Sequence, residues 1–293
     1  MNQGSKNIKP NFLYIGASKA GSSWLFECLR AHPAVFIPIA KDLQFFNLYY
    51  DKGTDWYQAF FDTKDTFLAY GEMSHDYFLA SKNAQRICDF NPSIKLIACL
   101  RNPVDKILSN YNYAKRTYLN EQVSFEEFFN NHSKYKKDET HNMGRENANY
   151  YDNLAPFYKL FPSENILILF YDDLKFQPEH FIQKVYNFLE VDENFTPPML
   201  HTKVNPNQSS RNSALAHVAY KVAAIVRQVG LSNVVGSIKR NKLVNAMLYQ
   251  NKSDDKKESL TDVELKMVND YYKKSYSKLV ELIGEELPEG WNV

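Results

Sequence analysis

Short apolar runs alternate with amphipathic segments along the chain, and this alternation predicts its secondary structure. Each apolar run lies close to a Pro, Gly or Asn and is short enough to be a buried strand. The expected strands are residues 12–15, 35–37, 94–100 and 165–171. Apolar residues at helical spacing follow them, and the expected helices begin near residues 22, 103, 151, 178 and 261.

The order of these elements predicts an α/β fold. Strands that alternate with helices form βαβ units, in which a central parallel sheet is covered by helices on both faces, giving three layers. Right-handed crossovers then place the strand-to-helix loops at one edge of the sheet, where ligands of such sheets bind. We expect one domain over residues 1–293, with a flexible start at 1–10, an exposed polar insertion at 117–149 that carries a short helix near 125–129, a long loop at 196–214, and an exposed loop at 251–259.

Composition excludes several classes of protein. The 35 Lys and Arg residues balance the 34 Asp and Glu residues, and 44% of the residues are hydrophobic, so neither a disordered acidic chain nor a strongly basic nucleic-acid binder is expected. Three cysteines without a C-x-x-C pair predict neither a disulfide framework nor a zinc site. No apolar run approaches the roughly 18 residues of a membrane span, and no signal peptide is visible, so we expect a soluble protein of a reducing compartment.

The loop between the first expected strand and helix has the composition of a phosphate-binding loop. It reads Gly16-Ala17-Ser18-Lys19-Ala20-Gly21-Ser22-Ser23, and its small residues let backbone amides and the helix N-terminus face an anion. It is not a Walker loop, because Lys19 precedes the last glycine instead of following it. From the loop alone, an ordinary strand-to-helix turn with a solvated lysine is an equal alternative.

Two signatures together resemble those of sulfotransferases that use 3′-phosphoadenosine 5′-phosphosulfate (PAPS). Residues 19–25 (KAGSSWL) resemble the K-x-G-[ST]-[ST]-W-L loop of that family, and Arg101-Asn102-Pro103, followed by Ser109 and Tyr111, resembles its second signature. In the family, the arginine and the serine of the second signature hold the 3′-phosphate of the donor. The resemblance implies a P-loop-type fold and a PAPS site formed by Lys19, Ala20, Gly21, Ser22, Ser23, Trp24, Arg101 and Ser109.

Further segments resemble the carbohydrate (heparan-type) sulfotransferases, over roughly residues 10–200 and more weakly the last helix. His32-Pro33 and residues 42–46 (DLQFF) resemble the H-P and [KN]-E-x-H-F-F segments, and residues 71–78 (GEMSHDYF) resemble the E-K-T-P-x-Y-F segment. Thr202-Lys203 resembles a T-K pair in a loop that closes over PAPS, which adds Lys203 to the expected catalytic residues. Ser210 and Arg211 are expected to supply further phosphate donors, and the segments 117–149 and 200–214 to shape the acceptor side.

The expected chemistry is in-line sulfuryl transfer, in which positioning and electrostatics do most of the work. Lys19 is expected to stabilise charge on the leaving oxygen, and no metal is expected. For the general base, the resemblance implies either Asp42, at the position of the family's glutamate, or His75, as in the cytosolic sulfotransferases; Asp42 could also orient His75. Glu72 is expected to be a structural carboxylate or an acceptor ligand, and Lys41 and Lys106 to be solvated or to steer phosphate.

Two other functions stay open on the sequence. A P-loop kinase or nucleotide hydrolase would require magnesium and ATP turnover, and a nucleotide-binding scaffold would bind adenosine 3′,5′-bisphosphate, the expected product, without transfer. The resemblance implies an acceptor hydroxyl on a carbohydrate or small molecule. The balanced charge and the short apolar runs predict no nucleic-acid partner and no membrane span. We expect a cytoplasmic enzyme, because PAPS is made in that compartment; the sequence does not predict the oligomeric state.

Overall fold

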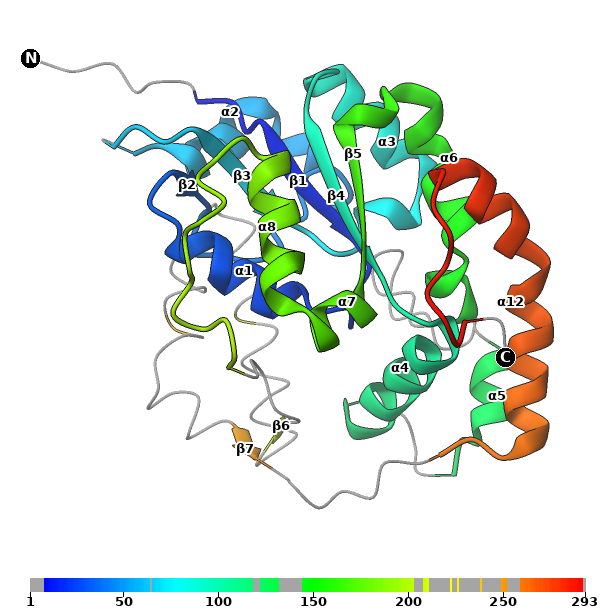
Figure 1. Ribbon diagram of the computed structural model, residues 1–293. Coiled ribbons are helices and arrows are strands. Elements are labelled where there is room, and N and C mark those ends of the chain that lie inside the picture. Colours follow the sequence, from blue (N-terminus) through cyan, green and yellow to red (C-terminus); the bar gives the residue numbers. More distant parts are fainter. Residues whose placement is uncertain are drawn as a thin grey trace, which may run out of the picture.

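The fold is built around one central sheet, which Figure 1 shows with its covering helices. The computed structural model describes residues 8–63, 65–117, 122–131, 144–202, 208–210, 249–251 and 259–291, together with positions 222, 226 and 238. Lys203 and Arg211 therefore lie outside the described residues, and Ser210 is described only as part of the backbone.

The sheet has five parallel strands in the order β2-β3-β1-β4-β5, which confirms the predicted parallel α/β architecture. The strands are β1 (Phe12–Gly16), β2 (Val35–Phe36), β3 (Ala69–Met73), β4 (Lys95–Leu100) and β5 (Ile166–Phe170). β1 lies in the middle, with Leu13 opposite Glu72 of β3 and Leu96 of β4. Strand order reverses direction at β1, so the crevice beyond its carboxyl end is the ligand position expected for such a sheet.

Helices cover both faces of the sheet. Figure 1 shows α1 (Ser22–Ala31) and α8 (Pro178–Phe188) on one face, and α3 (Ser81–Phe90) and α6 (Tyr150–Leu160) on the other. The last helix, α12 (Asp262–Ile283), packs against α6 and against α4 (Pro103–Thr117). Shorter elements are α2 (Thr54–Gln58), α5 (Phe125–Asn130), α7 (Tyr171–Phe176) and the antiparallel pair β6 (Gln208–Ser210) and β7 (Tyr249–Asn251).

Burial explains why the four predicted strands form. Residues Phe12 to Ile15 of β1 are fully buried, because helices cover the sheet on both sides and an uninterrupted apolar run suits such a strand. The predicted end of the last helix is also confirmed: Thr261 and Glu264 form a capping box, and Gly284 ends the helix in the left-handed conformation.

The predicted exposed insertion at 117–149 is wrong for its described parts. The short helix near 125–129 exists as α5, but Phe125, Phe128 and Phe129 are all buried. Asn147, in a short 3₁₀ helix at Arg145–Ala148, is also buried. The segment is polar in composition, yet it folds back against α4 and α12 because its aromatic residues gather on one side. The loop predicted over 196–214 likewise contains the short strand β6.

Candidate active site

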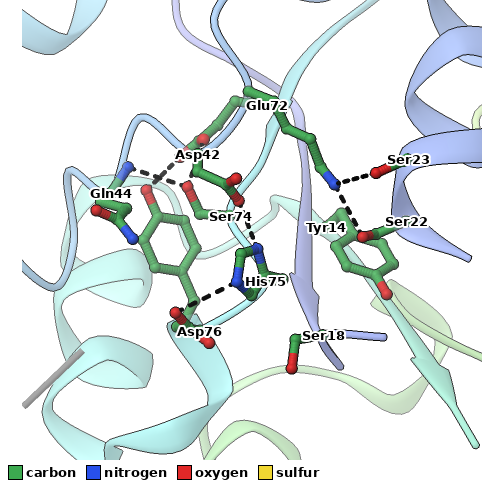
Figure 2. A network of polar contacts seen from close by, with 12 residues as sticks. Tyr14, Ser18, Ser22, Ser23, Asp42, Gln44, Glu72, Ser74, His75 and Asp76 are labelled. Carbon is green, nitrogen blue, oxygen red and sulfur yellow. Dashed lines mark hydrogen bonds and ion pairs between the residues drawn. The ribbon is translucent and has the colours of Figure 1, made fainter. Parts of the chain in front are cut away.

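Three loops meet beyond the carboxyl ends of the central strands, and Figure 2 shows the polar groups that they bring together. The first loop follows β1 and leads into α1, the second carries Lys41 to Gln44 after β2, and the third carries Ser74 to Asp76 after β3. We call residues 16–23 the donor loop, and Asp42, His75 and Asp76 the base cluster. The two lie side by side because β1 and β3 are neighbours in the sheet.

The donor loop is fixed by its backbone. The amide of Ala17 donates to the carbonyl of Cys99 at 3.0 Å, and its carbonyl accepts from the Tyr14 hydroxyl at 2.8 Å. Lys19 (φ 62°) and Gly21 (φ 80°) both adopt the left-handed conformation, which turns the chain sharply before α1. A Cβ atom on Gly21 would lie 2.4 Å from Cδ2 of Leu174, so a larger residue here would have to displace Leu174 as well as adopt the left-handed backbone.

The start of α1 has the features of an anion site. Gly21 caps the helix and offers no side chain to its amides, and no acidic residue stands in the first turn. The ammonium of Lys41 donates to Oγ of Ser22 at 2.9 Å and lies 3.3 Å from Oγ of Ser23. A cation and amides at the positive end of a helix repel one another unless an anion joins them, so this arrangement suits a phosphate or sulfate group.

Two further cations border this loop. The ammonium of Lys19 lies 4.3 Å from the ring centroid of Tyr113. Arg101, which follows β4, donates from Nη1 to the carbonyl of Lys19 at 3.0 Å and faces the ring of Tyr171 at 5.0 Å. Its Nε is buried and has no hydrogen-bond partner among the described residues. A buried donor without a partner fits an additional anionic oxygen at this position.

The base cluster is a histidine held between two carboxylates. Nδ1 of His75 lies 2.6 Å from Oδ1 of Asp42, and Nε2 lies 3.4 Å from Oδ2 of Asp76. Burial lowers the pKa of His75, but the two carboxylates outweigh burial and the net shift is upward. Burial raises the pKa of Asp42, but His75 and Lys41 outweigh it and hold that pKa well below its usual range. The pair therefore favours the imidazolium–carboxylate form in the free protein.

The loop that carries Asp42 has a strained backbone, and hydrogen bonds join it to the loop that follows β3. Asp42 (φ 60°) and Gln44 (φ 58°) adopt the left-handed conformation, which costs a non-glycine residue about 1–2 kcal/mol. The amide of Asp42 donates to the carbonyl of Met73 at 3.0 Å, and the amide of Gln44 to Oγ of Ser74 at 3.0 Å. These bonds to the neighbouring loop hold the strained backbone and aim Asp42 at His75.

Glu72, on β3 just before the second of these loops, is a structural carboxylate. It is fully buried, and its oxygens accept from the hydroxyls of Ser74, at 2.8 Å, and of Tyr77. Burial raises its pKa to about 7. Because Ser74 in turn accepts from Gln44, the hydrogen bonds of Glu72 position the loops on both sides of the base cluster.

The expectation that Lys106 is solvated is wrong. Lys106 is fully buried on α4, where its ammonium donates to Oγ of Ser18 at 2.8 Å and to Oδ1 of Asn147. Burial lowers its pKa well below the usual value, and the carboxylate of Asp76 opposes that shift. The helical spacing that predicts α4 rests on its aliphatic residues, and it gives no sign that the lysine among them is buried too.

The structure brings most of the predicted site residues to one edge. Ser22, Ser23, Asp42 and His75 lie near one another in Figure 2, Arg101 contacts the carbonyl of Lys19, and half-buried Ser109 follows on α4. Trp24 is placed differently: its indole packs on Phe181 of α8 and donates to the carbonyls of Met199 and Leu200.

Sequence reasoning missed Ser18, Asp76, Asn147 and the buried position of Lys106. Asp76 is next to a candidate residue, and that adjacency is the one available signal. Asn147 is distant in the sequence from the residues that it contacts here, so nothing local could have indicated it.

Two further observations concern the described residues. None of their helices is long and apolar enough to cross a membrane. Within the same part of the chain, no group of three or more His, Cys, Asp or Glu side chains is arranged to hold a metal ion.

Comparison with known proteins agrees with the geometry. A family model described as "Sulfotransferase domain" matches residues 9–280. A heparan sulfate glucosamine 3-O-sulfotransferase 3A1 from Mus musculus is 29% identical over 199 residues, which are 67% of this chain and 49% of that protein. A membrane-associated sulfotransferase, kil1 from Dictyostelium discoideum, is 32% identical over 108 residues, which are 36% of this chain and 23% of that protein.

The solved sulfotransferase from Alicyclobacillus acidocaldarius matches the fold with a TM-score of 0.60 at 24% identity, over 78% of this chain and 96% of that one. The matched region spans between about a quarter and a half of the curated relatives. Since the family model covers nearly the whole chain, including the donor loop, the base cluster and Arg101, this protein belongs to the sulfotransferase domain family.

Proposed function

We propose that this protein transfers the sulfuryl group of PAPS to a hydroxyl group of a carbohydrate acceptor. One observation carries the proposal: an uncapped helix N-terminus bordered by Lys19, Lys41 and Arg101 lies next to a histidine–aspartate pair. An anion site next to a proton acceptor is what sulfuryl transfer to an alcohol requires.

The donor loop and its cations would hold the donor, which supplies the activated sulfuryl group when bound. The amides of the first turn of α1, with the hydroxyls of Ser22 and Ser23, bind the 5′-phosphate. Lys19 stabilises the negative charge on the leaving oxygen. Arg101 uses its unpartnered Nε for the 3′-phosphate, with Ser109 as a second donor. Lys203, Ser210 and Arg211 stay predictions as further ligands.

The base cluster would take the acceptor's proton. Asp42 binds Nδ1 of His75 at 2.6 Å, so Nδ1 carries the hydrogen and Nε2 is the nitrogen that accepts. This is the division of labour of a catalytic triad, in which the carboxylate orients the imidazole and stabilises its charged form. Because the pKa of His75 is raised, the neutral imidazole becomes abundant only as the pH rises through that pKa, and the transfer rate should rise over the same range.

A carbohydrate acceptor is supported by the names of the relatives, several of which are heparan sulfate glucosamine 3-O-sulfotransferases. The alternative of a small-molecule alcohol is an arm of the test below. Work in the cytoplasm stays a prediction from the sequence. The kinase hypothesis has lost its support, because the family is that of sulfotransferases and not of P-loop kinases.

The test is transfer of labelled sulfate from PAPS to a panel of acceptors, namely glucosamine-containing oligosaccharides, other sugars and small alcohols. Label on an oligosaccharide supports the proposal as stated, and label only on small alcohols corrects the acceptor class. Binding of adenosine 3′,5′-bisphosphate without any transfer would favour a non-catalytic scaffold, and magnesium-dependent ATP turnover a kinase.

The same assay tests the base. His75→Ala should lower kcat by about 10²- to 10⁴-fold, the usual contribution of a general base, with little change in the affinity for adenosine 3′,5′-bisphosphate. Asp42→Ala should have a smaller effect, since an unoriented imidazole still accepts protons. His180→Ala, a change on the remote helix α8, is the control. If both site variants keep full activity, neither residue is the base.

A further inference from the structure

The second carboxylate next to His75 has no role in the function proposed so far. Asp76 is only 5% exposed, and its Oδ2 faces Nε2 of His75 at 3.4 Å. Figure 2 shows Asp42 and Asp76 on different sides of the imidazole ring, one facing each nitrogen. One carboxylate suffices to orient a histidine, so the second one requires a separate explanation.

This feature belongs to the chain and not to the segment that it resembles. When residues 72–78 are aligned position by position with E-K-T-P-x-Y-F, His75 stands where that pattern has proline, and Asp76 stands at its unspecified position. His75 is therefore a departure from the pattern, and Asp76 is the residue that this chain has at the position the pattern leaves open.

We propose that Asp76 is a positioning residue whose carboxylate lies on the Nε2 side of His75 and stabilises, through its charge, the positive charge that forms on the imidazole during transfer. The proposal rests on the proposed role of His75 as the proton acceptor. Asp42 orients the imidazole through Nδ1, and Asp76 stabilises the imidazolium from the side of Nε2.

The distances suit this task. A charge-assisted hydrogen bond measures about 2.7–2.9 Å, and the 2.6 Å contact between Asp42 and Nδ1 is at least as short, whereas 3.4 Å is longer than that range. At the longer distance Asp76 leaves Nε2 accessible to an acceptor hydroxyl. No hydrogen bond joins Nε2 and Oδ2 at this distance, so Asp76 acts on His75 through its charge. When Nε2 has taken the proton, the carboxylates of Asp42 and Asp76 together balance the positive charge of the imidazolium in a half-buried site.

Burial of Asp76 is compatible with an ionised carboxylate because positive groups attract it. His75 lies 3.4 Å away, and Lys106 and the carboxylate of Asp76 attract each other. Lys106 is itself held by Ser18 of the donor loop at 2.8 Å and by Asn147.

The charged groups that face His75 are Asp42, Asp76 and Lys41. The two carboxylates favour the imidazolium and Lys41 opposes it. Removing the charge of Asp76 should therefore make His75 easier to deprotonate, and the rise of activity with pH should move to lower pH. The same change should lower the rate at high pH, because the imidazolium that forms during transfer loses one of its two partners.

Asp76→Asn tests this, because asparagine has the same shape and no charge. We expect kcat at high pH to fall by about 10-fold or more, part of the contribution of a general base. The midpoint of the pH profile should shift to lower pH, and the affinity for adenosine 3′,5′-bisphosphate should stay within about twofold. Asp76→Glu should restore the wild-type midpoint in part. Asp51→Asn, an exposed change outside the site, is the control.

A second measurement separates this inference from the proposed function. The imidazole of His75 is titrated by nuclear magnetic resonance in wild type and in Asp76→Asn, with His75→Ala to assign the signal. A downward shift of the titration midpoint in the variant supports the inference even if no acceptor is sulfated. An unchanged midpoint, or a variant with normal kcat at high pH, overturns it. If Asp76→Asn fails to fold, the titration of Asp76→Ser, which also lacks the charge, against wild type decides, and an unchanged midpoint contradicts the proposal.

Discussion

The donor loop and the base cluster lie side by side but are built on opposite principles. The donor loop is made of small residues, backbone amides and hydroxyls, and the side chains that border it at Lys19, Lys41 and Arg101 are positive. The base cluster is made of charged side chains that pair with one another, on a backbone strained at Asp42 and Gln44. In the first region Arg101 is paired with one carboxylate, Asp105 at 3.5 Å, and the other groups are amides, hydroxyls and lysines, whereas in the second a carboxylate faces each nitrogen of His75.

This difference teaches how the site would separate binding from chemistry. An anion at the donor loop neutralises cations that otherwise repel the helix N-terminus, so binding and folding of the loop support one another. The base cluster already holds its counter-charges and has to be activated by loss of a proton. Changes in the donor loop should therefore alter donor affinity, and changes in the base cluster should alter the rate and its pH dependence.

The largest effect is expected for Lys19→Ala. Removal of one preorganised group that stabilises a developing charge lowers kcat by about 10²- to 10³-fold. The helices and strands should remain intact, since Lys19 is only half-buried and its ammonium lies over the ring of Tyr113. Rates are measured with saturating PAPS and acceptor. Lys52→Ala, an exposed change outside the site, should be neutral; activity of Lys19→Ala close to that of this control contradicts the role of Lys19.

An intermediate effect is expected for Gly21→Ala, and Gly284 provides a matched control. Both glycines are left-handed, but only at Gly21 would an added Cβ atom meet a neighbour, Cδ2 of Leu174 at 2.4 Å. Gly284→Ala should cost about 1–2 kcal/mol of unfolding free energy and leave the affinity for adenosine 3′,5′-bisphosphate unchanged. Gly21→Ala should cost more and should weaken that affinity by about 10-fold or more, because the amides at the start of α1 are displaced.

Calorimetric titration checks this pair of variants, and a double variant sharpens it. Leu174→Ala removes the atom that Gly21→Ala would meet, so the combination should recover part of the lost affinity. Equal affinities of Gly21→Ala and Gly284→Ala for adenosine 3′,5′-bisphosphate would mean that the donor loop binds this ligand even when its backbone is displaced. That result would contradict the proposal that the geometry of the loop sets the affinity.

The smallest effect on transfer is expected for Glu72→Gln, which acts through stability. The pKa of Glu72 is about 7 in the folded protein and 4.5 in the unfolded chain, so the folded state binds more protons between these values and wild type loses stability as the pH rises through them. Glutamine does not titrate. The stability of Glu72→Gln relative to wild type should therefore improve from about pH 5 to about pH 8, by an amount on the order of 2 to 3 kcal/mol.

Chemical denaturation at the two pH values measures this difference. Glu164→Gln, an exposed change, should show the same difference from wild type at both. If the difference in unfolding free energy between Glu72→Gln and wild type is also the same at both pH values, the carboxylate of Glu72 is ionised throughout this range. The hydrogen bonds that position the two loops then involve a charged group.

The local sequence pattern predicted an element correctly where the conformation of a short segment depends mainly on its own residues. The strands at 12–15, 94–100 and 165–171 are confirmed because an apolar run buried on both faces needs no information from elsewhere. The donor loop is of the same kind, since its glycine and its small residues set the turn by themselves. By contrast, β3 (AYGEM) was missed, because buried Glu72 interrupts its apolar run and is tolerated only through partners outside the strand.

The sequence by itself determined the parallel α/β fold, the turn of small residues before α1 and the candidates Asp42 and His75, because backbone preference and hydrophobic period act over a few residues. Only the tertiary structure decided that Asp42 and Asp76 face different nitrogens of one imidazole, and that Lys106 is buried against Ser18 and Asn147. Those contacts join residues that are far apart along the chain. Their energies depend on burial and on the charges nearby, which no local pattern contains.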